Sequence, residues 1–134
     1  MTLQAKELMI GDWVRNALLD EVFKMNTTSM RNMCWDEDNG TARYTIEPIP
    51  LTEEILKKNG FKFDGCFWCY HKSDFERVMI RFCSEDEDDM NERAYNFYVN
   101  HWVIDENYRI DYVHELQRAL RLCGLNDLAD NFKV

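Results

Sequence analysis

The change of hydrophobic period in the C-terminal half constrains the fold of this chain most strongly. After the aromatic segment 61–71, which is also expected to be a strand, apolar and polar side chains alternate in residues 76–83 and 94–104, so that Val78, Ile80 and Phe82 share one face. An alternation with a period of two indicates half-buried β-strands. From residue 111 to residue 123 the apolar side chains recur at steps of three and four, which is typical of an amphipathic helix. This half therefore predicts an antiparallel meander that is covered by a C-terminal amphipathic helix.

The first 50 residues contain shorter extended segments between turn signals. Four short segments are expected to be strands, residues 8–14, 22–25, 30–35 and 42–47, and in the first and last of them apolar side chains share a face at alternate positions. The Asn39-Gly40 pair favours a hairpin turn, and Pro48 ends the last segment because proline donates no ladder hydrogen bond. Strands this short and closely spaced are typical of a small bent β-sheet or half-barrel.

A short helix is expected between these two regions. Thr52 is a suitable N-cap, Glu53 suits the positive end of the helix dipole, and Gly60 suits the position after the last turn. The predicted fold class is thus α+β, ordered as bent sheet or half-barrel, short helix, meander and C-terminal helix. A length of 134 residues fits a single domain. If the chain divides, we expect residues 1–50 to form an N-terminal β lobe and residues 51–134 an α+β lobe.

The chain is acidic throughout, and this limits its partners. It carries 16 basic and 25 acidic side chains, a formal net charge of −9, with an excess of acid both before and after Gly60. Proteins that bind duplex nucleic acid present a basic face to the phosphates. We therefore expect no direct binding of DNA or RNA. A membrane span is not expected either, because the sequence has no run of about 18 apolar residues.

The N-terminal residues and the cysteines favour a cytoplasmic protein. Residues 1–7 lack the apolar run of a secretory signal, and an odd number of five cysteines fits reduced, packed thiols. Cys66 and Cys69 have the spacing of a redox dithiol or of half a zinc site. They fall in an aromatic segment that we expect to be a strand, where residues i and i+3 point to opposite faces. We therefore expect neither a metal site nor a cofactor.

Three blocks of the sequence resemble a family of small proteins. They are residues 7–14 (ELMIGDWV), residues 46–61 with the stretch IEPIPLTEEIL, and residues 112–117 (YVHELQ). In these blocks and in their order, the sequence is similar to an uncharacterised family that is abundant in Bacteroidetes genomes, their prophages and other mobile elements. The resemblance implies a phage or mobile-element context and assigns no catalytic residue.

A dense run of carboxylates is the candidate partner-binding element. Residues 85–92 contain six acidic side chains: Glu85, Asp86, Glu87, Asp88, Asp89 and Glu92. Such a run is either a solvated loop or an anionic patch that docks on a basic surface, as nucleic-acid mimics do. The resulting hypothesis is a non-catalytic acidic interaction protein that binds a basic protein surface or a nucleic-acid-binding complex. In a phage or mobile element it would inhibit a host nucleic-acid-handling or defence complex, in the manner of an anti-CRISPR protein.

An alternative hypothesis is a small nucleic-acid-associated accessory protein or enzyme. Asp111 and His114 are expected on one helix, where they could form a general acid–base site. No nucleophile elbow, P-loop, HExxH motif or dinucleotide-binding glycine motif accompanies them. The sequence therefore favours a non-catalytic role and assigns no catalytic residue.

Overall fold

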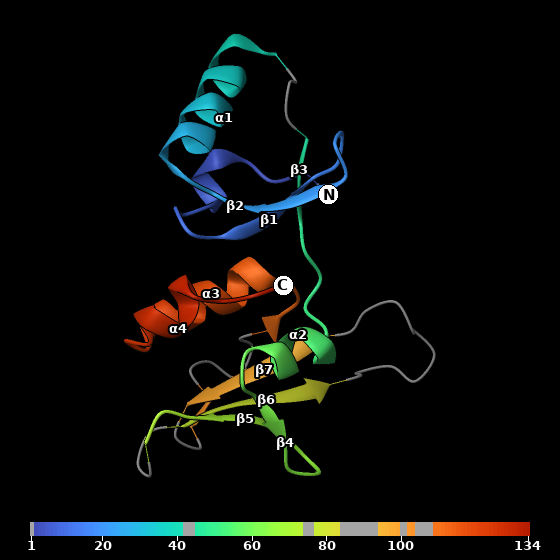
Figure 1. The fold of residues 1–134 in the computed structure, drawn as a ribbon, viewed down its shortest axis with the longest axis vertical. Coiled ribbons are helices and arrows are strands. Elements are labelled where there is room, and N and C mark those ends of the chain that lie inside the picture. Colours follow the sequence, from blue (N-terminus) through green and yellow to red (C-terminus); the bar gives the residue numbers. More distant parts are fainter. Residues whose placement is uncertain (1, 42–44, 74–76, 84–93, 100–101, 104–108) are drawn as a thin grey trace. The chain divides into compact units, whose positions relative to one another are not determined.

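The computed structural model describes residues 2–41, 45–73, 77–83, 94–99, 102–103 and 109–134 (Figure 1). The chain divides into two compact units. The first comprises Met1–Pro50 and Tyr112–Phe132, and the second comprises Leu51–Asp111 and Lys133–Val134. The C-terminal helices therefore belong to the unit that holds the N-terminal strands, whereas a division of the chain at residue 50 places them in the other lobe. The predicted α+β class is confirmed.

The first unit is built on a three-stranded antiparallel sheet with the order β2-β1-β3. Its elements are η1 (Ala5–Glu7), β1 (Trp13–Asn16), β2 (Glu21–Lys24), α1 (Thr27–Asn39), β3 (Ile46–Pro48), α3 (Val113–Leu122) and α4 (Asn126–Asp130). Within this unit the sheet lies between α1 on one face and α3 with α4 on the other (Figure 1). The core under α1 joins Met33 to Val14 and Ile46. On the other face α3 packs against β1, although the sequence assigned this helix to the meander.

Helix α1 lies where the sequence predicts a strand at residues 30–35 and a hairpin turn at Asn39-Gly40, so that prediction is wrong. The helix begins with reciprocal capping: Asn26 Oδ1 accepts a hydrogen bond from the Ser29 N–H at 2.9 Å, and Ser29 Oγ accepts one from the Asn26 N–H at 2.8 Å. It ends at Gly40, whose φ of 64° lies in the left-handed region that glycine favours. Of its apolar side chains, Met33 is buried and Met30 is partly buried. A helix with so few buried apolar residues leaves only a weak helical pattern of hydrophobic residues in the sequence.

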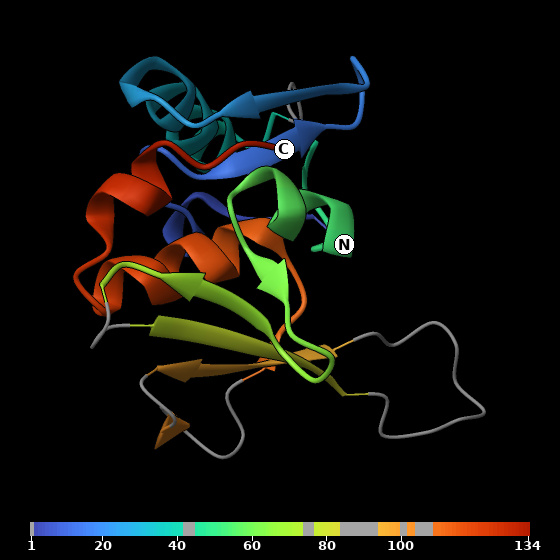
Figure 2. The same cartoon turned by 60° about the horizontal axis from the view of Figure 1, so that its bottom comes forward.

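The second unit contains an antiparallel sheet with the order β4-β5-β6-β7-β8, and β9 also pairs with β7. Its elements are α2 (Glu53–Lys58), β4 (Lys62–Phe63), β5 (Trp68–His71), β6 (Arg77–Cys83), β7 (Ala94–Val99), β8 (Trp102–Val103) and β9 (Arg109–Ile110). Figure 2 shows β5, β6 and β7 side by side in this sheet. The antiparallel meander that the alternation predicts is therefore present.

Helix α2 forms as the sequence predicts. Thr52 Oγ1 accepts a hydrogen bond from the Ile55 N–H at 3.3 Å, and Gly60 follows the last turn with a φ of 85°. The helix buries Leu56 completely, and Phe61 after the turn is 1% exposed. Local capping signals and one apolar anchor are thus sufficient to define this element.

Candidate interaction surface

The turn between β1 and β2 exposes two leucines. Leu18 is 63% exposed and Leu19 is 64% exposed. The buried side chain of Asn16 shapes the turn. Its Oδ1 accepts hydrogen bonds from the N–H groups of Leu18 at 3.0 Å and Leu19 at 3.3 Å. Asp20 ends the turn with a φ of 52°, in the left-handed region that Asp tolerates better than most residues. Polar residues therefore fix the backbone of this turn while apolar side chains occupy its surface.

Arg15 connects this turn to the far edge of the sheet. Its Nη1 donates to Glu47 Oε2 on β3 at 2.8 Å, and its Nε donates to Asp20 Oδ1 at 3.1 Å, with Nη2 bonded to the same oxygen. The hydrogen bond and the charge of Asp20 raise the pKa of Arg15, and Glu47 adds a smaller effect in the same direction. Val22 lies directly opposite Arg15 in the β1–β2 register. One cation is thus shared by two carboxylates, and this end of the sheet keeps an acidic excess.

We call Leu18, Leu19 and Val22 the hairpin patch. Val22 is 52% exposed, so three of the five consecutive residues 18–22 place apolar surface on one hairpin. Single exposed apolar residues are ordinary, whereas several that are grouped on one turn mark a contact surface more often. Acidic groups border the patch, since Asp20 has 80% of its side chain exposed and Glu21 is exposed. An apolar centre with an acidic border is suited to a partner that is apolar and basic.

Strand β2 is an edge strand with free backbone groups. The N–H and C=O of Met25, the residue after β2, bond to the backbone of residues 11–12 at 2.8 and 2.7 Å, so both groups face β1. The direction alternates along a strand, and Phe23 therefore also faces β1. The N–H and C=O groups of Val22 and Lys24 then point away from β1. Within the part of the chain that the structure describes, no strand pairs with this outer edge of β2.

A cavity of about 160 Å³ lies beside Phe23 of the same strand. Three apolar and four polar residues line it: Phe23, Met33, Ile46, Asn26, Thr28, Ser29 and Asn32. The polar residues come from the N-terminal part of α1 and the residue before it. A cavity of roughly 150 Å³ accepts a molecule as small as benzene. This cavity therefore has the size of a single apolar side chain.

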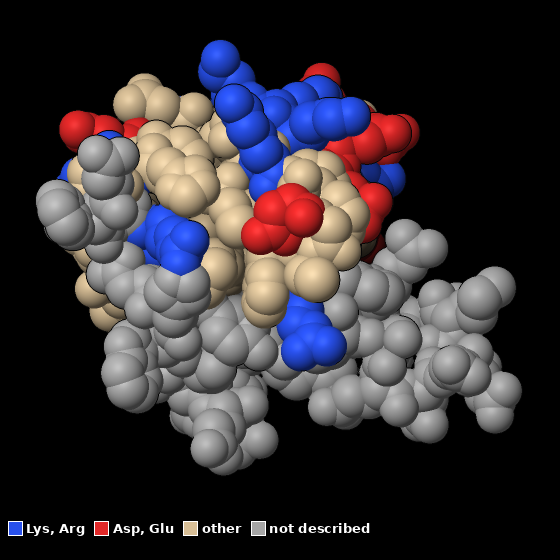
Figure 3. All heavy atoms as spheres, turned by 90° about the horizontal axis from the view of Figure 1, so that it is seen from below, with Lys and Arg blue, Asp and Glu red and all other residues tan. Residues whose placement is uncertain are grey.

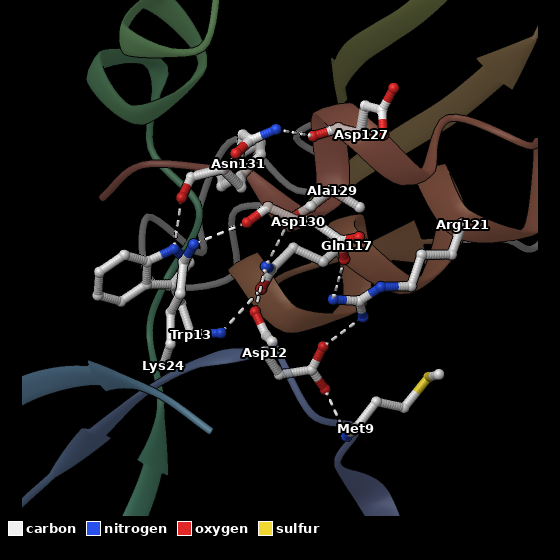
Figure 4. Close-up of polar contacts among 12 residues, drawn as sticks. Met9, Asp12, Trp13, Lys24, Gln117, Arg121, Asp127, Ala129, Asp130 and Asn131 are labelled. Carbon is white, nitrogen blue, oxygen red and sulfur yellow. Dashed lines mark hydrogen bonds and ion pairs between the residues drawn. The ribbon is translucent and has the colours of Figure 1, made fainter. Parts of the chain in front are cut away.

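A buried carboxamide ties α3 to β1 and α4 (Figure 4). Gln117 has no exposed surface, and its Nε2 donates to the carbonyls of Gly11 at 2.8 Å and Ala129 at 3.0 Å. Its Oε1 accepts a hydrogen bond from the backbone N–H of Trp13 at 2.9 Å. All these bonds connect parts of the fold, so Gln117 has a structural role.

An ion pair lies next to this carboxamide (Figure 4). Arg121 Nη1 donates to Asp12 Oδ1 at 2.6 Å, and Asp12 Oδ2 accepts from the Met9 N–H at 2.8 Å. Asp12 is fully buried and the Arg121 side chain is 12% exposed. Arg121 Nη2 also lies 3.6 Å from the exposed carboxylate of Asp130. Because Asp12 bonds both to Arg121 of α3 and to the backbone N–H of Met9, this pair also serves the packing of α3.

The structure does not assemble the acid–base site expected from Asp111 and His114. Helix α3 begins at Val113, so Asp111 precedes the helix and is exposed, whereas His114 is 5% exposed. Burial lowers the pKa of His114; the charge of Asp12 opposes this effect and that of Arg118 reinforces it. The expectation that the two residues share one helix is therefore wrong. A buried, neutral imidazole also has poor access to a substrate.

The acidic segment that the sequence singles out lies outside the described residues. This applies to all six of its side chains: Glu85, Asp86, Glu87, Asp88, Asp89 and Glu92.

The described surface charges of the second unit are mixed. The basic residues Lys57 and Lys58 of α2 lie one turn after its acidic first residues. Figure 3 shows acidic side chains next to basic ones on the face that it presents. The described charges on that face are thus mixed in sign.

The paired cysteines differ from the strand pair that the sequence predicts. Cys66 is exposed in the turn before β5, and Cys69 is buried within β5. Burial raises the pKa of the Cys69 thiol, and the charge of Asp64, whose Oδ2 lies 3.6 Å from the sulfur, acts in the same direction. A raised pKa leaves less of the nucleophilic thiolate. Cys34 is also exposed, so the expected burial of the thiols is wrong for Cys34 and Cys66.

The hairpin patch does not stand out in the sequence. Leu18 and Leu19 are adjacent, and neither a strand nor a helix period marks two neighbouring apolar residues as exposed. One signal could have found them. Asn16 and Asp20 flank the pair, and both are residue types that favour turns, so the leucines fall in the turn itself.

Comparisons with protein-family models, with curated proteins and with solved structures found no match to this chain. The resemblance to the Bacteroidetes and mobile-element family therefore remains a prediction. No helix in the described ranges is both long and apolar enough to span a membrane. Among the residues that the structure describes, no group of three or more His, Cys, Asp and Glu side chains could hold a metal ion.

Proposed function

We propose that this chain is a non-catalytic acidic interaction protein that binds a basic surface of a partner protein. The observation that carries the proposal is the hairpin patch, in which Leu18 and Leu19 are exposed on a turn whose backbone is fixed by the buried Asn16. Ordering these leucines on a defined turn reduces the entropy that would be lost when a partner covers them. Apolar side chains held in this way are suited to contact rather than to catalysis.

The charge of the chain supports a basic partner. A net charge of −9 attracts cationic surfaces and accelerates association with them at low ionic strength. Glu85, Asp86, Glu87, Asp88, Asp89 and Glu92 add a second acidic element in the sequence. Proteins that handle nucleic acids carry basic surfaces, and we propose such a complex as the partner class. For a phage or mobile-element protein, occupying that surface would inhibit a host defence or nucleic-acid-handling complex.

The enzyme alternative has less support in the described residues. His114 is 5% exposed, and it does not line the cavity beside Phe23. The other buried polar side chains next to it, Gln117 and Asp12, bond to backbone groups and to Arg121. A general base must reach the proton that it removes, and this arrangement gives His114 no such access.

A capture experiment with matched variants tests the proposed function. Three tagged proteins are incubated with a Bacteroidetes lysate at about 50 mM and about 300 mM salt. They are the full chain, the double variant Leu18→Ser/Leu19→Ser and the control Leu122→Ser. Leu122 is 72% exposed on α3, so its variant removes an exposed leucine at a different place in the first unit. We expect a basic protein bound by the wild type and by the control, lost from the double variant and weakened at high salt. Equal capture by all three proteins would contradict the proposal.

A further inference from the structure

We propose that β2 binds an extended segment of the partner protein as an additional antiparallel strand. An apolar side chain of that segment enters the cavity beside Phe23, and a basic side chain faces Glu21. This inference rests on the proposed function and specifies how the partner is held. It is carried by the free edge of β2, the cavity on one face of that strand and the exposed acid at its start.

The backbone of β2 provides the hydrogen bonds for such a strand. Val22 and Lys24 direct their N–H and C=O groups away from β1, as the bonds of the following Met25 to residues 11–12 establish. An antiparallel segment that pairs with Val22 exchanges two hydrogen bonds with it. Peptides bind exposed sheet edges in this way, with backbone bonds giving affinity and alternate side chains giving specificity.

The pleat of the sheet fixes the side chains that the segment must carry. Phe23 lies opposite Val14, whose side chain belongs to the core under α1, so a partner residue facing Phe23 lies on the face that carries the cavity. The next partner residue faces Val22 on the other side of the sheet. The residue after that faces Glu21, which is exposed. The partner segment should therefore carry an apolar residue opposite Phe23, an apolar residue opposite Val22 and a basic residue opposite Glu21.

The cavity suits one side chain of the first type. Its volume of about 160 Å³ and its apolar lining by Phe23, Met33 and Ile46 fit a leucine, isoleucine or methionine side chain. Phe23 and Met30 are only partly buried against this core, so apolar surface there is still available for burial. Asn32 and Thr28 add polar residues to the lining.

A second copy of this chain fits the β2 edge less well than a basic segment. In an antiparallel β2–β2 pair, Val22 and Lys24, whose backbone groups point outward, must meet each other, so Glu21, whose backbone groups face β1, can meet only Glu21, Phe23 or Met25 of the other copy. None of these residues is basic. Self-pairing would thus leave the carboxylate of Glu21 without a counter-charge, whereas a partner with Lys or Arg at that position neutralises it.

Binding of a fluorescein-labelled peptide to the full chain tests this inference. The probe Thr-Leu-Val-Lys-Thr places Leu opposite Phe23, Val opposite Val22 and Lys opposite Glu21. We expect a saturable rise in fluorescence polarisation. A second peptide carries N-methylvaline at its centre and lacks the N–H that would bond to the Val22 carbonyl. It should bind at least about tenfold more weakly. The absence of saturable binding up to about 1 mM peptide, or equal binding of both peptides, overturns the proposal.

Three protein variants complete the test. Val22→Pro removes the outward N–H and leaves the β1–β2 ladder intact, whereas the matched Val22→Thr keeps that N–H. We expect Val22→Pro to lose peptide binding and Val22→Thr to keep it. Glu21→Lys should prefer Thr-Leu-Val-Glu-Thr over the original probe. An unchanged preference overturns the assignment of Glu21.

The outcomes separate this inference from the proposed function. If the leucine double variant loses its captured partner but the Val22 and Glu21 variants bind partner and peptide like the wild type, the function stands and the β2 pairing is overturned. If the probe binds as expected and no leucine-dependent partner is captured, the pairing stands and the proposed function fails. Sedimentation of a dimer that Val22→Pro abolishes, without peptide binding, assigns the edge to a second copy and overturns the proposal.

Discussion

The side chain of Gln117 replaces a missing strand neighbour of Trp13. Its Oε1 accepts the Trp13 N–H at 2.9 Å, at a point where the pairing of β1 with β3 has ended at Val14. The Nε2 of the same carboxamide donates to the Gly11 carbonyl at 2.8 Å. One amide group thus makes the two bonds that a peptide group of an adjacent strand would make. The position of α3 on the sheet is therefore fixed by directed bonds as well as by apolar contact.

Gln117→Leu should lower the free energy of unfolding by roughly 3 kcal/mol. The substitution keeps the approximate volume and removes the partner of the partly buried Trp13 N–H and Gly11 carbonyl and of the buried Ala129 carbonyl. Urea unfolding followed by circular dichroism measures the change. The control is Asn131→Ala, which removes an exposed amide that donates to the Asp127 carbonyl. We expect that control to change stability by less than about 1 kcal/mol, and equal effects of both substitutions would contradict the structural role of Gln117.

Asp12→Asn should also destabilise the fold, by about 3 kcal/mol. The change keeps an oxygen for the Met9 N–H but removes the charge that faces Arg121 across 2.6 Å, and the guanidinium is largely buried. The matched control is Asp130→Asn, because Asp130 is the exposed second carboxylate near the same guanidinium. Its effect should stay within about 0.5 kcal/mol. If both variants lose a similar free energy of unfolding in urea, the buried Asp12–Arg121 pair does not stabilise the packing of α3 more than the exposed Asp130 does.

The elements that the sequence predicts correctly carry their own local signals. Thr52 and Gly60 define α2, and the alternation of residues 76–83 defines β6. The steps of three and four between apolar residues place α3 to within two residues. Each of these signals is contained in a short stretch of chain, so no knowledge of distant contacts is needed to interpret it.

The elements that the sequence misses depend on distant partners or on weak signals. Helix α1 buries little apolar surface and is defined by the Asn26–Ser29 caps, which a turn would also favour. An amphipathic stripe on α3 shows that the helix packs on something but does not show which sheet it covers. The outward position of the hairpin patch likewise follows from the β1–β2 register and from the burial of Asn16. These are properties of the assembled first unit.

Protonation of His114 should destabilise the fold as the pH falls. Burial lowers its pKa in the folded chain below the ordinary value of 6.5, so the unfolded chain binds the proton more readily. The stabilising contribution of the neutral, buried imidazole is complete above pH 6.5. It is lost as the pH falls from 6.5 toward the folded pKa, with a slope that approaches about 1.4 kcal/mol per pH unit.

Urea midpoints at several pH values between about 7.5 and 5 measure this dependence. His114→Gln has no titrating group in that range and should lose the part of the slope that His114 contributes. The control His71→Gln replaces a histidine that is exposed on β5 and should keep the slope of the wild type. A His114→Gln variant with the full wild-type slope would show that another group causes the dependence.

The backbone of Asp20 gives a direct test of the turn that displays the hairpin patch. Its φ of 52° lies in the left-handed region, where glycine is unstrained and a β-branched residue is strongly disfavoured. Asp20→Gly and Asp20→Val both remove the carboxylate that bonds to Arg15, so their difference isolates the backbone effect. We expect Asp20→Val to be less stable than Asp20→Gly by about 1–2 kcal/mol in urea unfolding.

Nuclear Overhauser spectra of Asp20→Gly give a second measurement of the turn. This variant should retain the cross-strand contacts between Asn16 and Glu21, since these residues pair at the end of the hairpin. Equal stability of the two variants would contradict the left-handed turn, and with it the orientation of Leu18 and Leu19 on which the interaction surface depends.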